Sequence, residues 1–75
     1  MTGKANAPEV GPWVEEQGLW VRRVAGRIVA EVFHDRWADH WTWRSFSGNR
    51  EQTGTEATLA DAQAQAGAAL ELVPR

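Results

Sequence analysis

The stretch with the most chemical potential is HDRWADH, residues 34–40, which carries two histidines and two aspartates around a tryptophan. Imidazole nitrogens and carboxylate oxygens are common ligands of zinc and other divalent metals. A mononuclear site here would use His34, His40 and one of the two aspartates. Structural zinc sites generally take four nitrogen or sulfur ligands, however, and this chain has no cysteine.

The same stretch also fits a polar turn between two strands, and we favour that interpretation. Asp35 and Asp39 would accept hydrogen bonds from turn amides. Arg36 would be solvated, and Trp37 would fold back over the edge of the core. We therefore expect no bound metal and no cofactor.

The sequence offers no complete set of catalytic groups. It lacks cysteine, tyrosine and a glycine-rich phosphate loop. Ser45 and Ser47 lie near His40 in the sequence, but no third member and no oxyanion hole accompany them. A domain of 75 residues also leaves little room for a ligand pocket of ~300 Å³ or more. We expect neither an enzyme nor a site for a small-molecule substrate.

The charge and the distribution of apolar residues bear on whether the protein binds nucleic acid, enters a membrane or is secreted. The formal net charge is −2, which gives no general attraction to nucleic acid or to an anionic membrane. No run approaches the ~20 apolar residues of a membrane span. The first ten residues, MTGKANAPEV, lack the apolar region of a secretory signal. We expect a cytoplasmic protein that does not bind membranes.

Three segments are predicted along the chain. Residues 1–11 combine Gly, Ala, Asn and Pro without an apolar period and are predicted to be a flexible tail. Residues 12–69 are predicted to form a single domain. Residues 70–75 end in LVPR, which matches a thrombin recognition sequence, so we interpret them as a cloning scar and thrombin-site remnant.

The strongest local pattern is a β-hairpin in which LWVRRV (19–24) pairs with RIVAEVFH (27–34) around the turn Ala25-Gly26. Counting outward from that turn places two sets of residues on opposite faces. The predicted buried face holds Leu19, Val21, Arg23, Ile28, Ala30 and Val32. The predicted outer face holds Trp20, Arg22, Val29, Glu31 and Phe33.

The sequence leaves the number of further strands open. HWTWRSF (40–46) alternates and predicts a third strand, with Trp41 and Trp43 directed at the core. EQTGTEA (51–57) fits either a loop or a short fourth strand. GPWVEEQG (11–18) fits either one helical turn or an extended lead-in.

TLADAQAQAGAAL (58–70) predicts the only helix, with Thr58 and Asp61 in a variant of the capping box. One face of this helix consists of Leu59, Ala62, Ala66 and either Ala69 or Leu70. Because this face is nearly all alanine, the helix can approach the sheet closely and bulky tryptophans can fill the remaining space. We also expect close packing to be the reason for Gly67. The predicted architecture is α+β: a three-stranded antiparallel sheet, or four-stranded if residues 51–57 pair, packed on one C-terminal helix in two layers.

The outer sheet face is the candidate functional surface. A patch that combines Trp20, Val29 and Phe33 would be unusual on a bare monomer, and Trp and Arg dominate interface hot spots. A solvated sheet with a few scattered apolar groups is the alternative. We predict a small non-enzymatic module that binds a protein partner or a second copy of itself. The predicted binding residues are Trp20, Arg22, Arg27, Val29, Glu31, Phe33 and Arg44.

The segments GRIVAEVFHD, WTWRSF and TLADAQAQAGAAL resemble the DNA-binding domain of plant ethylene-response factors and the amino-terminal domain of bacterial and phage integrases. The matching features are Ala30-Glu31-Val32, Trp43 and the helix from Thr58, and the resemblance covers about residues 19–70. Similar tryptophan-bearing strands and alanine-rich helices occur in small uncharacterised bacterial and prophage proteins.

The resemblance implies a second hypothesis, in which the same sheet face lies in the DNA major groove. By that resemblance, Arg22, Arg27, Glu31 and Arg44 would face DNA. This chain departs from the family at Phe33, where the family has an arginine. The helix also resembles the end of a double-stranded-RNA-binding domain. Its first residues are TLA instead of phosphate-binding lysines, so the RNA function does not carry over.

Overall fold

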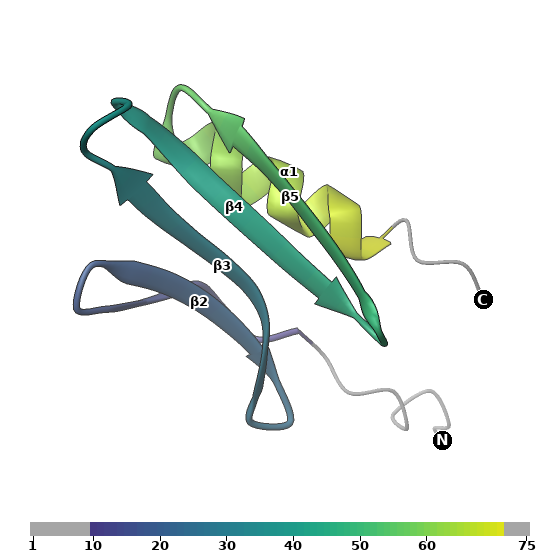
Figure 1. The fold of residues 1–75 in the computed structure, drawn as a ribbon. Helices are drawn as coiled ribbons and strands as arrows, with labels where there is room; N and C mark the ends of the chain where they lie inside the picture. Colours follow the sequence, from purple (N-terminus) through teal and green to yellow (C-terminus); the bar gives the residue numbers. More distant parts are fainter. Residues whose placement is uncertain (1–9, 72–75) are drawn as a thin grey trace, which may run out of the picture.

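Five consecutive strands form one antiparallel sheet in the computed structural model, which describes residues 10–71 (Figure 1). The strands pair strictly with their sequence neighbours, in the order β1-β2-β3-β4-β5. Their bounds are β1 Val14–Glu16, β2 Leu19–Val24, β3 Arg27–Asp35, β4 His40–Ser47 and β5 Arg50–Glu56. One helix, α1 (Leu59–Glu71), follows and lies behind β4 and β5 in the view of Figure 1.

The predicted α+β class, antiparallel sheet and C-terminal helix are confirmed, whereas the predicted number of strands is wrong. The sheet has five strands instead of three or four. β1 forms within residues 11–18, which fitted either a helical turn or an extended segment. β5 covers most of residues 51–57, which fitted either a loop or a short strand. The helix of the described region has 13 residues and is too short to cross a membrane.

Two tight hairpin turns explain why β1 is a strand. Gln17 and Gly18 have φ angles of 55° and 87°, and Ala25 and Gly26 have φ angles of 52° and 81°. Positive φ at both central positions is typical of type I′ turns, whose twist matches that of paired strands. In the helical-turn alternative for residues 11–18, Gly18 would end the turn. It instead completes a hairpin, and its amide donates a hydrogen bond of 2.6 Å to Glu15 Oε2.

The helix begins as predicted, because Thr58 Oγ1 accepts a hydrogen bond of 3.1 Å from the amide of Asp61. Its sheet-facing residues are also the predicted ones. Ala62, Ala66 and Ala69 are buried, and Leu59 and Leu70 are partly buried against them. The packed helix therefore extends past residue 69, the predicted end of the domain.

A β-bulge between β2 and β3 reverses part of the predicted hairpin register. The two pairs next to the turn are as predicted, including Arg23 with Ile28. Beyond them, Val29 is an extra residue, so Arg22 pairs with Ala30 and Trp20 pairs with Val32. We call the sheet face covered by α1 the inner face and the other the outer face. The bulge moves Trp20 and Arg22 to the inner face.

The core is made of tryptophans on the sheet and alanines on the helix. Trp43 is buried among Ala30, Val32 and the helix alanines, and Trp13, Trp20 and Trp41 pack around this cluster. The prediction that Trp41 and Trp43 face the core is thus confirmed. The indole of Trp43 lies directly over Gly54, its partner in β5.

Some of the predicted segment boundaries cannot be compared with the structure. Residues 1–9 of the predicted tail and residues 72–75 of the predicted remnant lie outside the described residues. Gly11, within the predicted tail, is held by the sheet, because its amide donates a hydrogen bond of 2.8 Å to the carbonyl of Arg23.

Gly54→Ala is expected to destabilise the fold by roughly 1–3 kcal/mol, the usual cost of overpacking a core. A Cβ at this position would lie 2.8 Å from three atoms of the Trp43 indole. Urea denaturation followed by tryptophan fluorescence would measure the loss.

Gly67→Ala is the matched control. A Cβ there would meet only Arg22 Nη1 at 3.8 Å, an ordinary contact, so the expectation of close packing at Gly67 is wrong. Because alanine favours helix, this variant should be neutral or up to about 1 kcal/mol more stable. Equal destabilisation by the two variants would contradict this account of the core.

Candidate functional site

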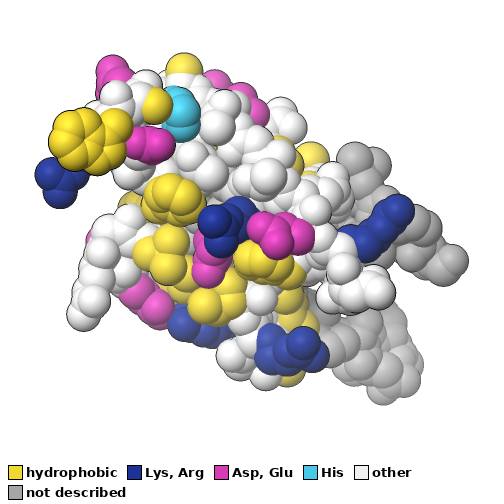
Figure 2. All heavy atoms as spheres, in the orientation of Figure 1, with side chains coloured by type: hydrophobic (Ala, Val, Ile, Leu, Met, Phe, Trp, Pro, Cys, Tyr) yellow, Lys and Arg dark blue, Asp and Glu magenta, His cyan; other side chains and the backbone are white. Residues whose placement is uncertain are grey.

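The outer face is the candidate site, because within the described residues no helix covers it. Figure 2 shows hydrophobic side chains gathered over the middle of this face, with acidic and basic side chains among them. The strand register places the following side chains on it: Val14, Leu19, Val21, Glu31, Phe33, Thr42, Arg44, Phe46, Glu51, Thr53 and Thr55. Leu19 and Val21 were expected on the opposite, helix-covered face.

The structure separates Trp20 and Arg22 from the other predicted binding residues. Both were predicted to lie on the outer face, and the bulge places both on the inner face instead. The reason is volume. An alanine helix face leaves space beside it, and the large indole of Trp20 fills this space better than Leu19 or Val21 could.

On the inner face, Arg22 contacts two residues that precede β1, Gly11 and Trp13. Its Nε donates a hydrogen bond of 2.7 Å to the carbonyl of Gly11. Its guanidinium carbon lies 5.6 Å from the centre of the Trp13 ring, within cation–π range. Arg22 therefore ties the segment before β1 to the sheet.

Three predicted residues, Glu31, Phe33 and Arg44, do lie together on the outer face. Glu31 is directly opposite Arg44 in the register of β3 and β4. The guanidinium of Arg44 lies 6.0 Å from the centre of the Phe33 ring. Arg44 Nε also lies 3.8 Å from Glu51 Oε2. This cation therefore has an aromatic ring and the Glu51 carboxylate near it, and a second acidic residue, Glu31, directly opposite on β3.

The last two predicted residues, Arg27 and Val29, lie at the other end of the sheet. They line a hollow of about 200 Å³ between the β2–β3 and β4–β5 turns. The hollow is lined by Val24, Arg27, Ile28, Val29, Phe46 and Gly48. The predicted binding residues thus divide among the inner face, the outer face and this hollow.

The β3–β4 turn presents a residue whose exposure the sequence did not predict. Trp37 was expected to fold over the core edge, but it is 99% exposed. The turn itself is held by Asp35, whose Oδ1 accepts hydrogen bonds from the amides of Trp37 (3.0 Å) and Ala38 (3.3 Å). The carbonyl of Asp35 accepts a further bond of 2.8 Å from the amide of Asp39.

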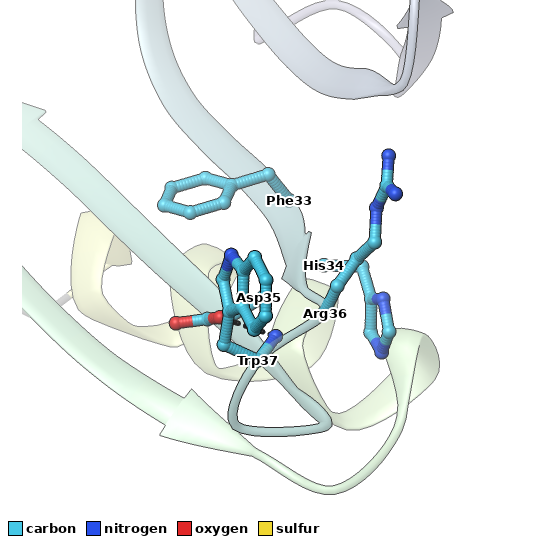
Figure 3. Close-up of a pocket in the computed structure, with 5 residues that line it drawn as sticks. All are labelled: Phe33, His34, Asp35, Arg36 and Trp37. Carbon is cyan, nitrogen blue, oxygen red and sulfur yellow. Dashed lines mark hydrogen bonds between the residues drawn. The ribbon is translucent and has the colours of Figure 1, made fainter.

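Trp37 borders an open hollow of about 790 Å³ with residues of the end of β3. In Figure 3, Phe33, Asp35 and Trp37 are drawn to one side of the turn, with the Trp37 indole lower in the view than the Phe33 ring, while His34 and Arg36 point to the other side. The apolar side of this hollow is continuous with the outer face through Phe33. Phe33 and Trp37 therefore both line this open hollow at one end of the sheet.

The two histidines lie on opposite faces of the sheet. His34 pairs with Trp41 on the inner face, and its ring centre lies 4.9 Å from that of the indole. His40 pairs with Asp35 on the outer face. Each is near a different aspartate: His34 Nε2 lies 3.4 Å from Asp39 Oδ1, and His40 Nε2 lies 3.9 Å from Asp35 Oδ2. Within residues 10–71, no three acidic or histidine side chains gather in a metal-binding group.

The turn interpretation of residues 34–40 is only partly right in detail. Asp35 accepts hydrogen bonds from turn amides as predicted, and Arg36 is exposed. The side chain of Asp39 faces His34 instead of an amide, and Asp39 adopts a φ of 56°. The spacing of two aspartates around three residues could have indicated a turn that directs Trp37 outward, since Asx turns fix the following backbone.

The charged pair with the shortest contact lies at the β1 end of the sheet. Arg23 donates hydrogen bonds of 2.7 Å and 3.1 Å to the two carboxylate oxygens of Glu16. These bonds lower the pKa of Glu16 below its usual range, partial desolvation opposes the change, and the charge of Arg23 adds to the lowering. Arg23 and Arg44 therefore both have carboxylates beside them.

Comparison with known proteins does not place this chain in a family. No family model, no curated protein and no solved structure matches this chain.

Asp35→Ala is expected to release the β3–β4 turn, because the amides of Trp37 and Ala38 lose their shared acceptor. The backbone N–H of Trp37 should then show a lower heteronuclear NOE in ¹⁵N NMR relaxation. Asp35→Asn keeps an oxygen acceptor and should retain the native value. Equal mobility of Trp37 in all three proteins would contradict the ordering role of Asp35.

Arg23→Gln is expected to raise the pKa of Glu16 toward its ordinary value, measurable by carboxyl ¹³C NMR titration. Because the pKa of Glu16 is lowered in the folded protein, its ion pair favours folding above the ordinary glutamate pKa. That contribution is lost as pH falls through the lowered value. Arg44 lies on β4, away from Glu16 on β1, so Arg44→Gln should leave the titration of Glu16 unchanged.

Proposed function

We propose that this protein is a small non-enzymatic module that binds a protein partner through the outer face of its sheet. The observation that carries the proposal is the fully exposed Trp37, held by an ordered turn beside Phe33 at one end of that face. The proposed contact set is Val14, Leu19, Phe33, Trp37, Arg44 and Phe46. Trp20 and Arg22 are not part of it.

The energetic argument rests on the indole of Trp37. A tryptophan side chain can bury roughly 150–250 Å². At about 25 cal/mol per Å², a partner that covers it gains roughly 4–6 kcal/mol before the costs of association. Because Asp35 already orders the backbone of the turn, the backbone entropy lost on binding is small, and the main ordering cost is that of the Trp37 side chain.

The charges of the outer face favour a protein over a nucleic acid. A DNA-binding face needs cations that are available to phosphates. Here Arg23 is paired with Glu16, and Arg44 lies beside Glu51 and opposite Glu31. Mixed charges around apolar side chains are typical of the rim of a protein interface. Arg22, which the family resemblance assigned to DNA, lies on the other face.

The first test uses a photo-crosslinking amino acid at single positions of the protein in cells. With p-benzoylphenylalanine in place of Trp37 or Val14, both exposed, we expect a discrete covalent adduct with one protein. The same residue in place of Gln65, exposed on the helix, is the control. Adducts of equal yield from Gln65, or none from position 37 or 14, would refute the proposal.

The second test measures affinity for the captured partner. Trp37→Ala should weaken binding at least tenfold, as hot-spot truncations do, and should leave the melting temperature unchanged because Trp37 makes so little contact with the fold. Arg36→Ala, a change at the exposed neighbouring residue, is the control and should alter the Kd less than threefold.

A further inference from the structure

Among residues 10–71, the outer edge of β5 is a second surface that no other element pairs with or covers. β5 pairs with β4 along all seven of its residues, without a register shift. It is the last strand of the sheet, so every second residue directs its N–H and C=O away from β4. β1, at the opposite edge, has only three residues. β5 is thus the longer and more regular edge.

β5 carries few of the features by which proteins protect an edge strand. Natural edges are interrupted by proline, lysine or a bulge, or are covered by another element. The sequence REQTGTE has no proline and no lysine. Thr53 and Thr55 favour an extended backbone. Such an edge is suited to accept another strand.

We propose that β5 pairs antiparallel with β5 of a second copy, with Thr53 at the two-fold axis, and joins two sheets into one. This register places Arg50 of each copy directly opposite Glu56 of the other. Both side chains lie on the inner face, since they pair with Ser47 and Trp41 of β4. Opposed residues of opposite charge favour an antiparallel pair, and the symmetry supplies two such pairs.

Charge also selects this register over its neighbours. A slip by one residue in one direction places Glu51 opposite Glu56 of the second copy, which is a repulsive pair. A slip in the other direction loses both Arg50–Glu56 pairs and gains none. The register centred on Thr53 uses all seven residues of β5 and is the one that opposes unlike charges at both ends.

The helices leave room for this pairing. In this register, each residue lies opposite a residue from the same face of the second copy. Both copies of α1 therefore lie on the same side of the joined sheet. α1 packs on β3, β4 and β5, so we take its axis to lie over β4, the middle strand. Three strand spacings of about 4.8 Å then separate the two helix axes by ~14 Å, more than the 8–10 Å of helices in contact. The gap accommodates the Arg50 and Glu56 side chains.

The proposed dimer does not depend on the proposed function, because it uses the edge of the sheet and not its outer face. Sedimentation equilibrium of the wild-type protein at micromolar to millimolar concentration should show a monomer–dimer equilibrium. Arg50→Glu and Glu56→Arg, each alone, should weaken the dimer roughly tenfold or more, since each change creates two like-charge pairs.

The decisive experiment mixes these two variants. In the mixed pair, every contact between positions 50 and 56 again joins opposite charges, so the equimolar mixture should dimerise at a concentration at which each variant alone is mostly monomeric. Arg27→Glu, at the distant β2–β3 turn, makes the same charge change and should not alter the equilibrium.

Three outcomes would overturn the proposal. They are a wild-type monomer at every concentration, a dimer indifferent to both substitutions, and a mixture that stays monomeric while circular dichroism shows both variants folded. Glu56 also accepts a hydrogen bond of 3.4 Å from Trp43 Nε1. If Glu56→Arg fails to fold, Arg50→Glu still carries the test of weakened dimerisation. A dimer that Trp37→Ala disrupts and Arg50→Glu does not would assign self-association to the outer face.

Discussion

The structure depends on the contact between an alanine face of α1 and a tryptophan-bearing sheet. Ala62 and Ala66 are completely buried, and their small side chains bring the helix so close that Ser45 Oγ on β4 donates a 2.7 Å hydrogen bond to the carbonyl of Ala66. The space around this contact is filled from the sheet side, above all by Trp43, for which Gly54 leaves room. Small residues on one layer and large ones on the other thus fill a thin core at native density.

That contact also explains the register of the first hairpin. α1 covers β3, β4 and β5, so the inner face beyond β3 needs other cover. Trp20 supplies it once the bulge directs it inward, and Arg22 joins it by holding the carbonyl of Gly11 and stacking near Trp13. The bulge therefore extends the aromatic core beyond the reach of the helix. An unbroken register would have placed smaller side chains there and left an indole on the outer face.

Features set by local chemistry could be predicted from the sequence, and features set by volume could not. The Thr58 cap, the alanine face and the turn at Ala25-Gly26 each follow from a few neighbouring residues. The bulge could not be predicted, because LWV is apolar in either register and only the space beside α1 decides between them. For the same reason only part of the predicted surface lies on the expected face: Glu31, Phe33 and Arg44 lie beyond the bulge, on β3 and β4, where the predicted facing is the observed one.

Burial separates the apolar residues that the fold explains from the one that it does not. Val21 lies on the outer face yet is fully buried, so its hydrophobicity already stabilises the sheet. Phe33 is half-buried, and the guanidinium of Arg44 lies 6.0 Å from the centre of its ring. Trp37 is different: at 99% exposure its indole contributes almost nothing to folding, and any polar residue would suit the turn that Asp35 orders. A partner that covers Trp37 would bury a large apolar side chain that the fold itself leaves exposed, and for this reason we place the proposed binding surface at the Trp37 end of the outer face.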